Sequence, residues 1–422
     1  MLYLPEVIQH RLFACIYCLH HITVDLSYTG LVLANYNLTM RSNRMQTILN
    51  QVLLGGAPSR LGSVALASGG SARPACSAVV VHEFGAPEVM KVEQKALPTL
   101  GPGQVLVNIK AAGVNPSDTY IRLGPEGPYA ATPHLLPKLP FTPGKTGAGV
   151  VVSLGESVAS VKVGDRVYVH AALTGTYASH AVCDAETLEI LPAAVSYAQG
   201  ATLGVAGSTA YYALCQRGGL RDPLLAPPGA EKEACNILVH GASGSVGLAA
   251  VQLARAITTG TVAGTAGTDQ GGAAASAAGA AVVANHRSES YVDDLRKAVP
   301  GGFDLILEMF GHVNLPTDLA LASKRGKICI IGSRSQTVPV NPRHFMNVEA
   351  EVRGVFLPQA TAEDRKTIAR GLRMHLENGT LKPVIGQEMP LADAARAHKE
   401  VMAPSSGGAA GSIVLIPDDQ DD

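Results

Sequence analysis

The chain has 422 residues, which is long enough for two ordinary domains with separate hydrophobic cores. Hydrophobic residues make up 47% of the chain and charged residues 16%, a composition that excludes an intrinsically disordered protein. The formal net charge of −1 argues against nucleic acid as the main partner, and no apolar run reaches the roughly 18 to 20 residues of a membrane span.

Residues 1–77 have the composition of an N-terminal extension. No acidic residue occurs from Leu26 to His82. Four arginines lie there among small and apolar residues: Arg41, Arg44, Arg60 and Arg73. This composition is typical of a targeting presequence and predicts the mitochondrial matrix, with a cytoplasmic protein bearing a disordered extension as the open alternative.

The seven cysteines are dispersed, as is usual for reduced thiols inside cells. Cys15 and Cys18 form a CxxC pair, but a zinc site needs a second ligand pair and a haem attachment needs a histidine directly after the second cysteine. We therefore expect no metal at this pair.

Short β-branched runs separated by Gly, Pro and Asp follow the extension and predict a mostly antiparallel β domain. The expected strands cover residues 78–85, 105–114, 147–155 and 165–172, and no long helical pattern occurs before Tyr197. Residues 196–216 predict helical segments that are broken by Gly207.

Strands and helices then alternate, which predicts a parallel sheet covered on both faces. The expected strands are residues 236–241, 261–267, 281–286, 303–310 and 327–333, and the expected helices are residues 245–257, a segment ending near 280, and 291–299. The tail predicts helices at 363–379 and 391–402 and strands at 383–390 and 411–417; this tail could return to complete the first domain.

The stretch VHGASGSVG, beginning at Val239, lies between the strand and helix that a dinucleotide-binding turn requires. Small residues let the backbone approach a pyrophosphate, and Gly247 allows close packing of helix and strand. The helix N-terminus offers free N–H groups to the phosphates. The alternative is a tight turn without a ligand.

The second strand, TVAGTAGT, lacks the terminal acidic residue that binds the ribose 2′-hydroxyl of NAD. A carboxylate there would repel a 2′-phosphate, so its absence permits NADP. Asp269 follows shortly after this strand, and Arg287 and Arg334 are candidate partners for the phosphate.

Several unusual segments occur together between about Ala78 and Pro417: AGVNPSDTYIRLG, VGDRVYV, GSTAYYAL, LVHGASGSVGLAAVQLARA, ILEMFGHVNLPTDLAL, IIGSR, NPRHFM and LKPVIG. Together they resemble quinone oxidoreductases of the zeta-crystallin type, the zinc-independent branch of the medium-chain dehydrogenase/reductase superfamily. The resemblance implies an α/β fold in which a Rossmann domain, residues 202–355, is inserted into a GroES-like, mostly β catalytic domain, residues 78–201 and 356–422.

The resemblance also implies NADPH as cofactor, a quinone or enone as substrate, and a homodimer or homotetramer. Tyr120 matches the tyrosine near the nicotinamide and Asn115 the polar residue beside it; these are the catalytic candidates. The predicted cofactor-binding residues are Tyr120, Thr209, Ser243, Gly244, Ser245, Val246, Gly267, His286, Arg287, Asn314, Ile331, Gly332, Ser333, Arg334, Val355, Phe356 and Leu357.

No catalytic zinc is expected on independent grounds, because Asn115 occupies the first-ligand region and the segment PGKTGAG has no His or Glu. The chain departs from the family at Thr146, where relatives commonly have an acidic residue, and at TDQGGAAASAAG, where they often carry a lysine. Two alternatives remain open: a mitochondrial enoyl-thioester reductase, and an NADPH-binding protein with a structural or RNA-associated role.

Overall fold

The computed structural model describes residues 75–130, 132–227, 229–335, 337–403 and 410–418. Residues 1–74, which make up most of the predicted extension and include Cys15 and Cys18, lie outside these residues. The first strand, β1 (Ala75–Val81), begins inside the segment assigned to the extension and pairs with β2 (Met90–Ala96) in an antiparallel hairpin.

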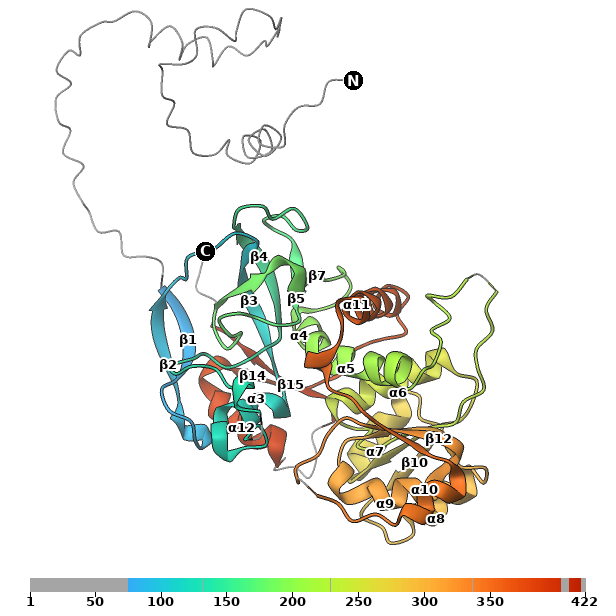
Figure 1. Ribbon diagram of the computed structural model, residues 1–422. Coiled ribbons are helices and arrows are strands. Elements are labelled where there is room, and N and C mark those ends of the chain that lie inside the picture. The colour runs from blue at the N-terminus through green and yellow to red at the C-terminus, as the bar shows by residue number, and fades with distance from the viewer. Residues whose placement is uncertain (1–74, 131, 228, 336, 404–409, 419–422) are drawn as a thin grey trace, which may run out of the picture. The chain divides into compact units, whose positions relative to one another are not determined.

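Six parallel strands form the predicted nucleotide-binding sheet (Figure 1). They are β8 (Ile237–Val239), β9 (Val262–Ala266), β10 (Val282–Asn285), β11 (Phe303–Glu308), β12 (Ala322–Ile330) and β13 (Glu351–Gly354). Their order in the sheet is β10-β9-β8-β11-β12-β13, which is the 3-2-1-4-5-6 order of a Rossmann fold. The predicted α/β class is confirmed, and the strand order reverses between β8 and β11, which is where sheets of this kind bind ligands at the carboxyl ends of their strands.

Helices connect these strands. They are α6 (Ser245–Ile257), α7 (Asp269–Ala277), α8 (Tyr291–Ala298), α9 (Gly311–Leu321) and α10 (Pro342–Val348). Helix α6 has the predicted bounds, and its small and aliphatic side chains bury one face against the sheet. The prediction missed α9, α10 and β13.

Seven strands form the second sheet, which is mostly antiparallel. They are β3 (Gln104–Val114), β4 (Gly147–Leu154), β5 (Arg166–Val169), β6 (His180–Asp184), β7 (Leu188–Ile190), β14 (Ile385–Pro390) and β15 (Ser412–Ile416). The order is β14-β15-β3-β4-β5-β7, with β6 also paired to β3. Because β15 pairs with β3, the C-terminal tail does return to the strands that follow the N-terminal extension, as expected.

Three α-helices and several 3₁₀ turns lie in the described parts of the chain that carry this sheet. They are α3 (Pro116–Leu123), α11 (Ala362–Glu377), α12 (Ala394–Met402) and the 3₁₀ turns η2 (Pro87–Val89), η3 (Gly124–Glu126), η4 (Pro133–Leu135), η5 (Ala185–Thr187), η8 (Leu357–Gln359) and η9 (Leu391–Asp393). Thr361 caps α11 through a reciprocal capping box with Asp364. The division of the chain at residues 201/202 and 355/356 stays a prediction.

A continuous helical segment leads from the second sheet to the first. It consists of α4 (Tyr197–Ala201), the π-helical turn η6 (Leu203–Gly207), α5 (Ser208–Tyr211) and the π-helical turn η7 (Tyr212–Arg217). The prediction that Gly207 breaks this helix is wrong, because Gly207 has right-handed helical dihedral angles and is buried.

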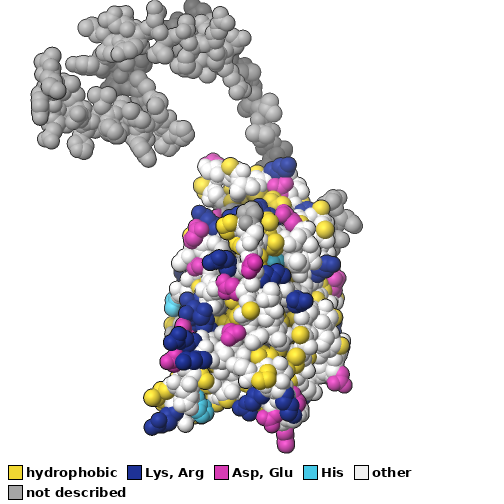
Figure 2. All heavy atoms as spheres, turned by 90° about the vertical axis from the view of Figure 1, so that its right-hand side faces the viewer, with side chains coloured by type: hydrophobic (Ala, Val, Ile, Leu, Met, Phe, Trp, Pro, Cys, Tyr) yellow, Lys and Arg dark blue, Asp and Glu magenta, His cyan; other side chains and the backbone are white. Residues whose placement is uncertain are grey.

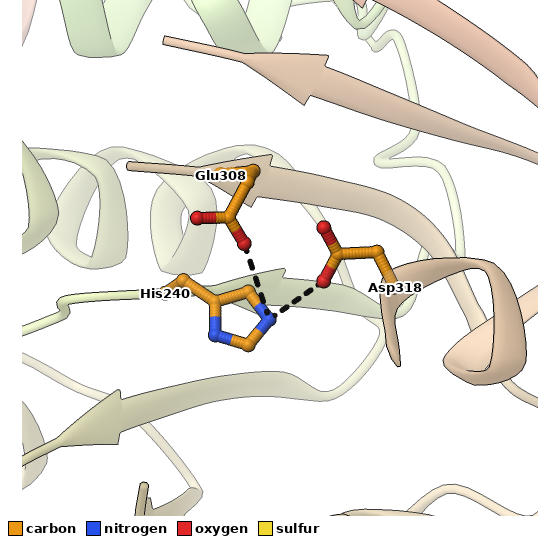
Figure 3. A group of neighbouring side chains, drawn as sticks. All are labelled: His240, Glu308 and Asp318. Carbon is orange, nitrogen blue, oxygen red and sulfur yellow. Dashed lines mark ion pairs between the residues drawn. The ribbon is translucent and has the colours of Figure 1, made fainter. Parts of the chain in front are cut away.

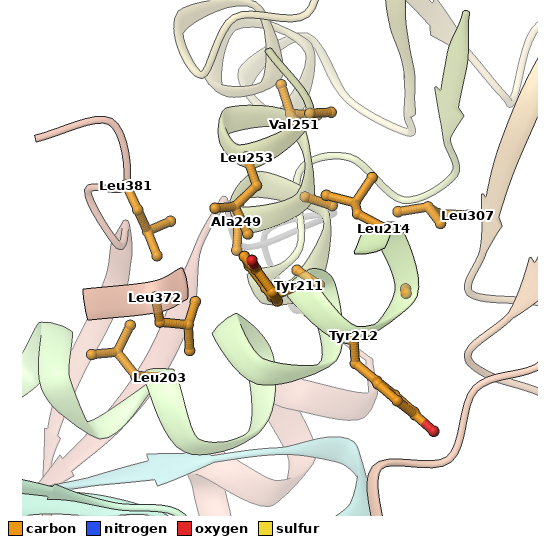
Figure 4. Close-up of a cluster of buried hydrophobic side chains, with 14 of the residues drawn as sticks. Leu203, Tyr211, Tyr212, Leu214, Ala249, Val251, Leu253, Leu307, Leu372 and Leu381 are labelled. Atoms are coloured by element: carbon orange, nitrogen blue, oxygen red, sulfur yellow. The ribbon is translucent and has the colours of Figure 1, made fainter. Parts of the chain in front are cut away.

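The largest hydrophobic core lies around this segment (Figure 4). Leu203 and Tyr211 pack with side chains of α6 and α11, such as Leu253 and Leu372. A Cβ on Gly371 would lie 2.2 Å from Cζ of Tyr211, so α11 can approach the tyrosine ring only with glycine there. This core fixes the α6 N-terminus relative to the helical segment.

The visible face in Figure 2 carries basic and acidic side chains that are interspersed, without a continuous basic band across the described residues shown there. Among the described residues, none of the helices has the length and apolar character that crossing a bilayer requires.

Candidate functional site

The predicted cofactor-binding residues gather at one edge of the parallel sheet. All six strands end at this edge, and each is followed by residues that the sequence singled out. β8 is followed by the glycine-rich turn, β9 by Gly267, β10 by His286 and Arg287, β11 by Asn314 in α9, β12 by Ile331, Gly332, Ser333 and Arg334, and β13 by Val355, Phe356 and Leu357. In open α/β sheets, ligands bind outside the carboxyl ends of the strands, so these residues share the expected crevice.

The glycine-rich turn has the geometry of an anion cradle. Gly241 has a φ of +59°, which side-chain-bearing residues rarely adopt. A Cβ on Gly247 would lie 2.2 Å from the carbonyl oxygen of Gly241, so the turn and α6 can meet only with glycine at this position. Gly244 is the N-cap and no side chain caps the helix, so the N–H groups of Ser245 and Val246 are directed beyond its N-terminus.

Two basic side chains lie beside the end of β9. A Cβ on Gly267 would lie 2.8 Å from Nε2 of His286 and 3.1 Å from Nε of Arg287. Asp269 is exposed in the first turn of α7. The guanidinium of Arg334 instead stacks over the Phe310 ring at 4.7 Å. The structure therefore brings Arg287, and not Arg334, to the place where a 2′-phosphate would follow the second strand.

Three ionisable side chains are buried at the switch point between β8 and β11 (Figure 3). Nε2 of His240 lies 2.9 Å from Oδ1 of Asp318 and 3.6 Å from Oε2 of Glu308. Burial, together with the Asp318 charge in the case of Glu308, raises the pKa of both carboxyl groups to about 7, and burial lowers the pKa of His240. The sequence analysis missed this cluster, although polar residues at the ends of apolar strands were the signal.

Gly411, directly before β15, connects the two sheets at the glycine-rich turn. The backbone N–H of Gly411 donates to the carbonyl of Ser243 at 2.9 Å, and Gly244 and Gly411 form a β-bridge. Two residues later Ile413 pairs with Val114 of β3. The pairing places the residue after Val114, Asn115, near the glycine-rich turn.

Asn115 is the buried N-cap of α3 and is held by its neighbours. Its Nδ2 lies 3.1 Å from Oδ2 of Asp118, 3.4 Å from Oγ1 of Thr146 and 3.4 Å from the carbonyl oxygen of Gly113. Burial raises the pKa of Asp118 to about 6, against the hydrogen bonds from Asn115. Since the amide N–H groups already have acceptors within the protein, Asn115 orients α3 and is poorly placed to donate to a substrate.

Tyr120, the other predicted catalytic residue, lies on α3, and its ring meets that of Tyr129 edge-on at 6.2 Å. Thr209 is buried in α5, next to the π-helical turn. A small cavity separates this turn from α6; Gly207, Ser245 and Ser412 are among the residues that line it. The π-helical turn η6, the N-terminus of α6 and the start of β15 therefore meet at this cavity.

A larger cavity of about 490 Å³ lies on the side of α3 that carries Asp118 and Ile121. Lys145 and Phe141 contribute to its other walls. The walls combine apolar side chains with several polar and charged ones.

The surroundings of Asn115 do not fit a catalytic zinc ion. The nearest polar groups are one carboxylate, a threonine hydroxyl and the amine-bearing Lys145, whereas zinc requires three Cys, His or acidic ligands. In the described part of the chain, His240, Glu308 and Asp318 are the one group with ligand atoms close enough for a shared ion. That group belongs to the nucleotide-binding sheet.

Comparisons with known proteins agree with this geometry. Residues 101–221 match the family model "Alcohol dehydrogenase GroES-like domain", and residues 245–372 match "Zinc-binding dehydrogenase". The chain is 40% identical to the quinone oxidoreductase of Sus scrofa over 342 residues, which are 81% of this chain and 97% of that protein. The chain belongs to the quinone oxidoreductase family. The predicted resemblance is thus confirmed.

Two further quinone oxidoreductases support this membership. The human protein is 40% identical over 341 residues, covering 80% of this chain and 97% of its own length. The crystal structure of the Escherichia coli protein in complex with NADPH is 30% identical, with a TM-score of 0.70, and the match covers 81% of this chain and all of that one (100%). The GroES-like and nucleotide-binding parts of the fold are therefore those of this family.

Proposed function

We propose that this protein is an NADPH-dependent quinone oxidoreductase that transfers reducing equivalents to quinones or related electron-poor conjugated carbonyls. The observation that carries the proposal is that the glycine-rich turn lies at the carboxyl edge of the six-stranded sheet and is bridged there to the residues that pair with β3, just before α3. The relatives named quinone oxidoreductase, and the Escherichia coli relative bound to NADPH, support the same activity.

The residues present fit NADPH. The open N-terminus of α6 would hold the pyrophosphate, because only the Gly241 carbonyl lies within 4 Å of a Cβ built on Gly244, at 3.5 Å. His286 and Arg287 beside Gly267 would bind the 2′-phosphate. When bound, NADPH supplies a hydride.

The protein side of the reaction then concerns orientation and charge. Tyr120 would donate from Oη to the acceptor carbonyl, which stabilises negative charge developing on oxygen. Asn115 would fix the first turn of α3 through Asp118 and Thr146, so that Tyr120 keeps its position. We propose that no zinc takes part, because the groups around Asn115 lack a ligand set.

The test is to follow NADPH oxidation by the purified protein with ortho-quinones, enones and an enoyl-CoA in turn. We expect turnover with quinones, preference for NADPH over NADH, and full activity after treatment with a zinc chelator. Preference for enoyl-CoA would favour the enoyl-thioester reductase instead. Binding of NADPH without turnover of any acceptor would contradict an enzymatic role.

We also propose a mitochondrial matrix location and a homodimer or homotetramer. The absence of acidic residues between Leu26 and His82 supports the location. A full-length fusion should enter mitochondria, whereas a chain without residues 1–74 should stay in the cytosol. Sedimentation analysis of the purified protein should give a mass at least twice that of one chain, and a monomer would contradict the assembly.

A further inference from the structure

We propose that His240, Glu308 and Asp318 share protons in a buried cluster that positions two cofactor loops, an inference that rests on the proposed NADPH-binding function. The first loop is the glycine-rich turn, residues 240–244, and the second is the β11–α9 turn, residues 309–314. The three side chains of the cluster point toward one another from the end of β8, from β11 and from α9, the elements next to these loops (Figure 3).

The cluster holds the first loop through Thr265 of β9. Nδ1 of His240 lies 3.2 Å from Oγ1 of Thr265, and the N–H of Gly241 donates to the same oxygen at 3.2 Å. The N–H of Ala242 donates to the Thr265 carbonyl at 2.8 Å. Three successive residues of the turn are thereby connected to one residue of the neighbouring strand.

The cluster holds the second loop through Glu308. Its Oε1 accepts hydrogen bonds from the backbone N–H of Phe310 and from Nδ2 of Asn314, the latter at 3.2 Å. Asn314 is one of the predicted cofactor-binding residues. The other carboxylate oxygen, Oε2, faces His240, so a single side chain connects the turn to the cluster.

Within the cluster a proton is required. The side chains of Glu308 and Asp318 are fully buried, and that of His240 is 3% exposed. Nε2 of His240, Oε2 of Glu308 and both oxygens of Asp318 have no aligned hydrogen-bond partner among the described residues. Two ionised carboxylates so close together in an apolar site would repel each other. The state with one proton shared between them therefore has the lower free energy.

The hydrogen bonds around His240 are compatible with a neutral ring. Oγ1 of Thr265 accepts from Gly241 and can donate its own hydrogen to Nδ1 of His240. With that tautomer Nε2 carries the ring proton and lies 2.9 Å from Oδ1 of Asp318.

The charge of the cluster follows pH. With a neutral His240 and one shared proton the cluster carries one negative charge, and loss of that proton adds a second beneath the phosphates. Two more titratable groups face it: His286 after β10, and Tyr291 of α8, whose hydroxyl bonds Thr317. Near neutral pH, deprotonation of the cluster should therefore weaken NADPH binding.

The experiment measures the Kd of NADPH by fluorescence between pH 6.5 and 8.5, without any quinone. We expect the Kd of the wild-type protein to rise about fivefold over this range. Glu308→Gln and Asp318→Asn keep the size of the side chains but remove one titrating carboxyl group, so their Kd should change less than twofold. His286 and Tyr291 are present in all variants, so a loss of pH dependence in the variants reports the titration of the cluster.

The matched control is Asp222→Asn, which alters another buried His–Asp pair. Nε2 of His375 lies 3.1 Å from Oδ2 of Asp222, in the core beside α11. This variant should lose stability but keep the wild-type pH dependence of the Kd. Wild-type pH dependence in both cluster variants would overturn the proposal, as would one tightly bound divalent ion per chain that Asp318→Asn removes. A wild-type protein that binds no NADPH would overturn the proposed function itself.

Discussion

Gly247 controls how α6 meets the glycine-rich turn, and Gly247→Ala tests this geometry directly. The new methyl group would lie 2.2 Å from the Gly241 carbonyl oxygen and 2.7 Å from Cα of Ala242. Both atoms belong to the backbone, so no side chain can rotate away. The turn itself must move by about 1 Å to restore normal van der Waals contact.

The magnitude follows from two opposing effects. Alanine is about 1 kcal/mol better than glycine inside a helix. Forcing a methyl group into a packed site costs about 1–3 kcal/mol, and more where backbone has to shift. We expect a net destabilisation of about 1–2 kcal/mol, or a Tm lowered by about 2–6 °C. Displacement of the phosphate-binding N–H groups should raise the Kd of NADPH at least about tenfold.

The assay combines thermal unfolding with NADPH titration. The matched control is Gly272→Ala in α7, where a Cβ would meet only Cγ1 of Val283 at 3.8 Å. This control should be as stable as wild type or slightly more stable, with unchanged NADPH binding. A Gly247→Ala protein with wild-type Tm and wild-type affinity would refute the close-approach argument.

Three further predictions address the rest of the site. Arg287→Ala should weaken NADPH binding about tenfold and leave NADH binding unchanged, because only NADPH carries the 2′-phosphate; equal effects on both cofactors would count against Arg287 as its partner. Tyr120→Phe should lower kcat about 100-fold with NADPH affinity within about threefold, and an unchanged kcat would remove the tyrosine from the mechanism. Burial and the charge of Arg122 lower the pKa of His398 to about 3. The unfolded chain therefore binds a proton below about pH 6.5 that the folded protein does not, and stability should fall by about 1.4 kcal/mol per pH unit towards pH 3. His398→Gln should flatten the dependence of Tm on pH between 6.5 and 5, and a slope equal to that of wild type would contradict this assignment.

The elements that the sequence predicted best are those whose own side chains determine them. α6 begins at a glycine turn and has an apolar face over its whole length, so its predicted and observed bounds agree. β2 gave no such signal, because only Met90 of its seven residues is buried. Pairing with β1 along its full length makes it a strand.

The sequence did not predict α3, and it wrongly predicted a helix break at Gly207; these two errors have different causes. The signal for α3 was present: Asn115 as N-cap, Pro116 at the first helical position and Asp118 at the third are a capping box, but the helix is too short for a periodic pattern. Gly207 was expected to end a helix because glycine favours the coil. In the structure, tight packing against neighbouring helices outweighs that preference.

The site residues also divide into those that sequence motifs predict and those that only the structure reveals. The loop residues followed from motifs and from the strand order that the motifs imply. The cluster of His240, Glu308 and Asp318 did not, because its members are up to 78 positions apart and meet only when β8 and β11 become neighbours. The amide of Asn115 was expected to face the substrate, and only the positions of Asp118 and Thr146 reveal that its donors are already used.

The place of β15 has a consequence for how the chain folds during synthesis. This strand lies between β14 and β3, and it pairs with a strand that left the ribosome about 300 residues earlier. The second sheet therefore cannot be completed until β15 has been synthesised, whereas the six strands of the nucleotide-binding sheet are all available before then. Until β15 pairs, β3 and β14 present unpaired edges, which is the stage at which a chaperone would matter most.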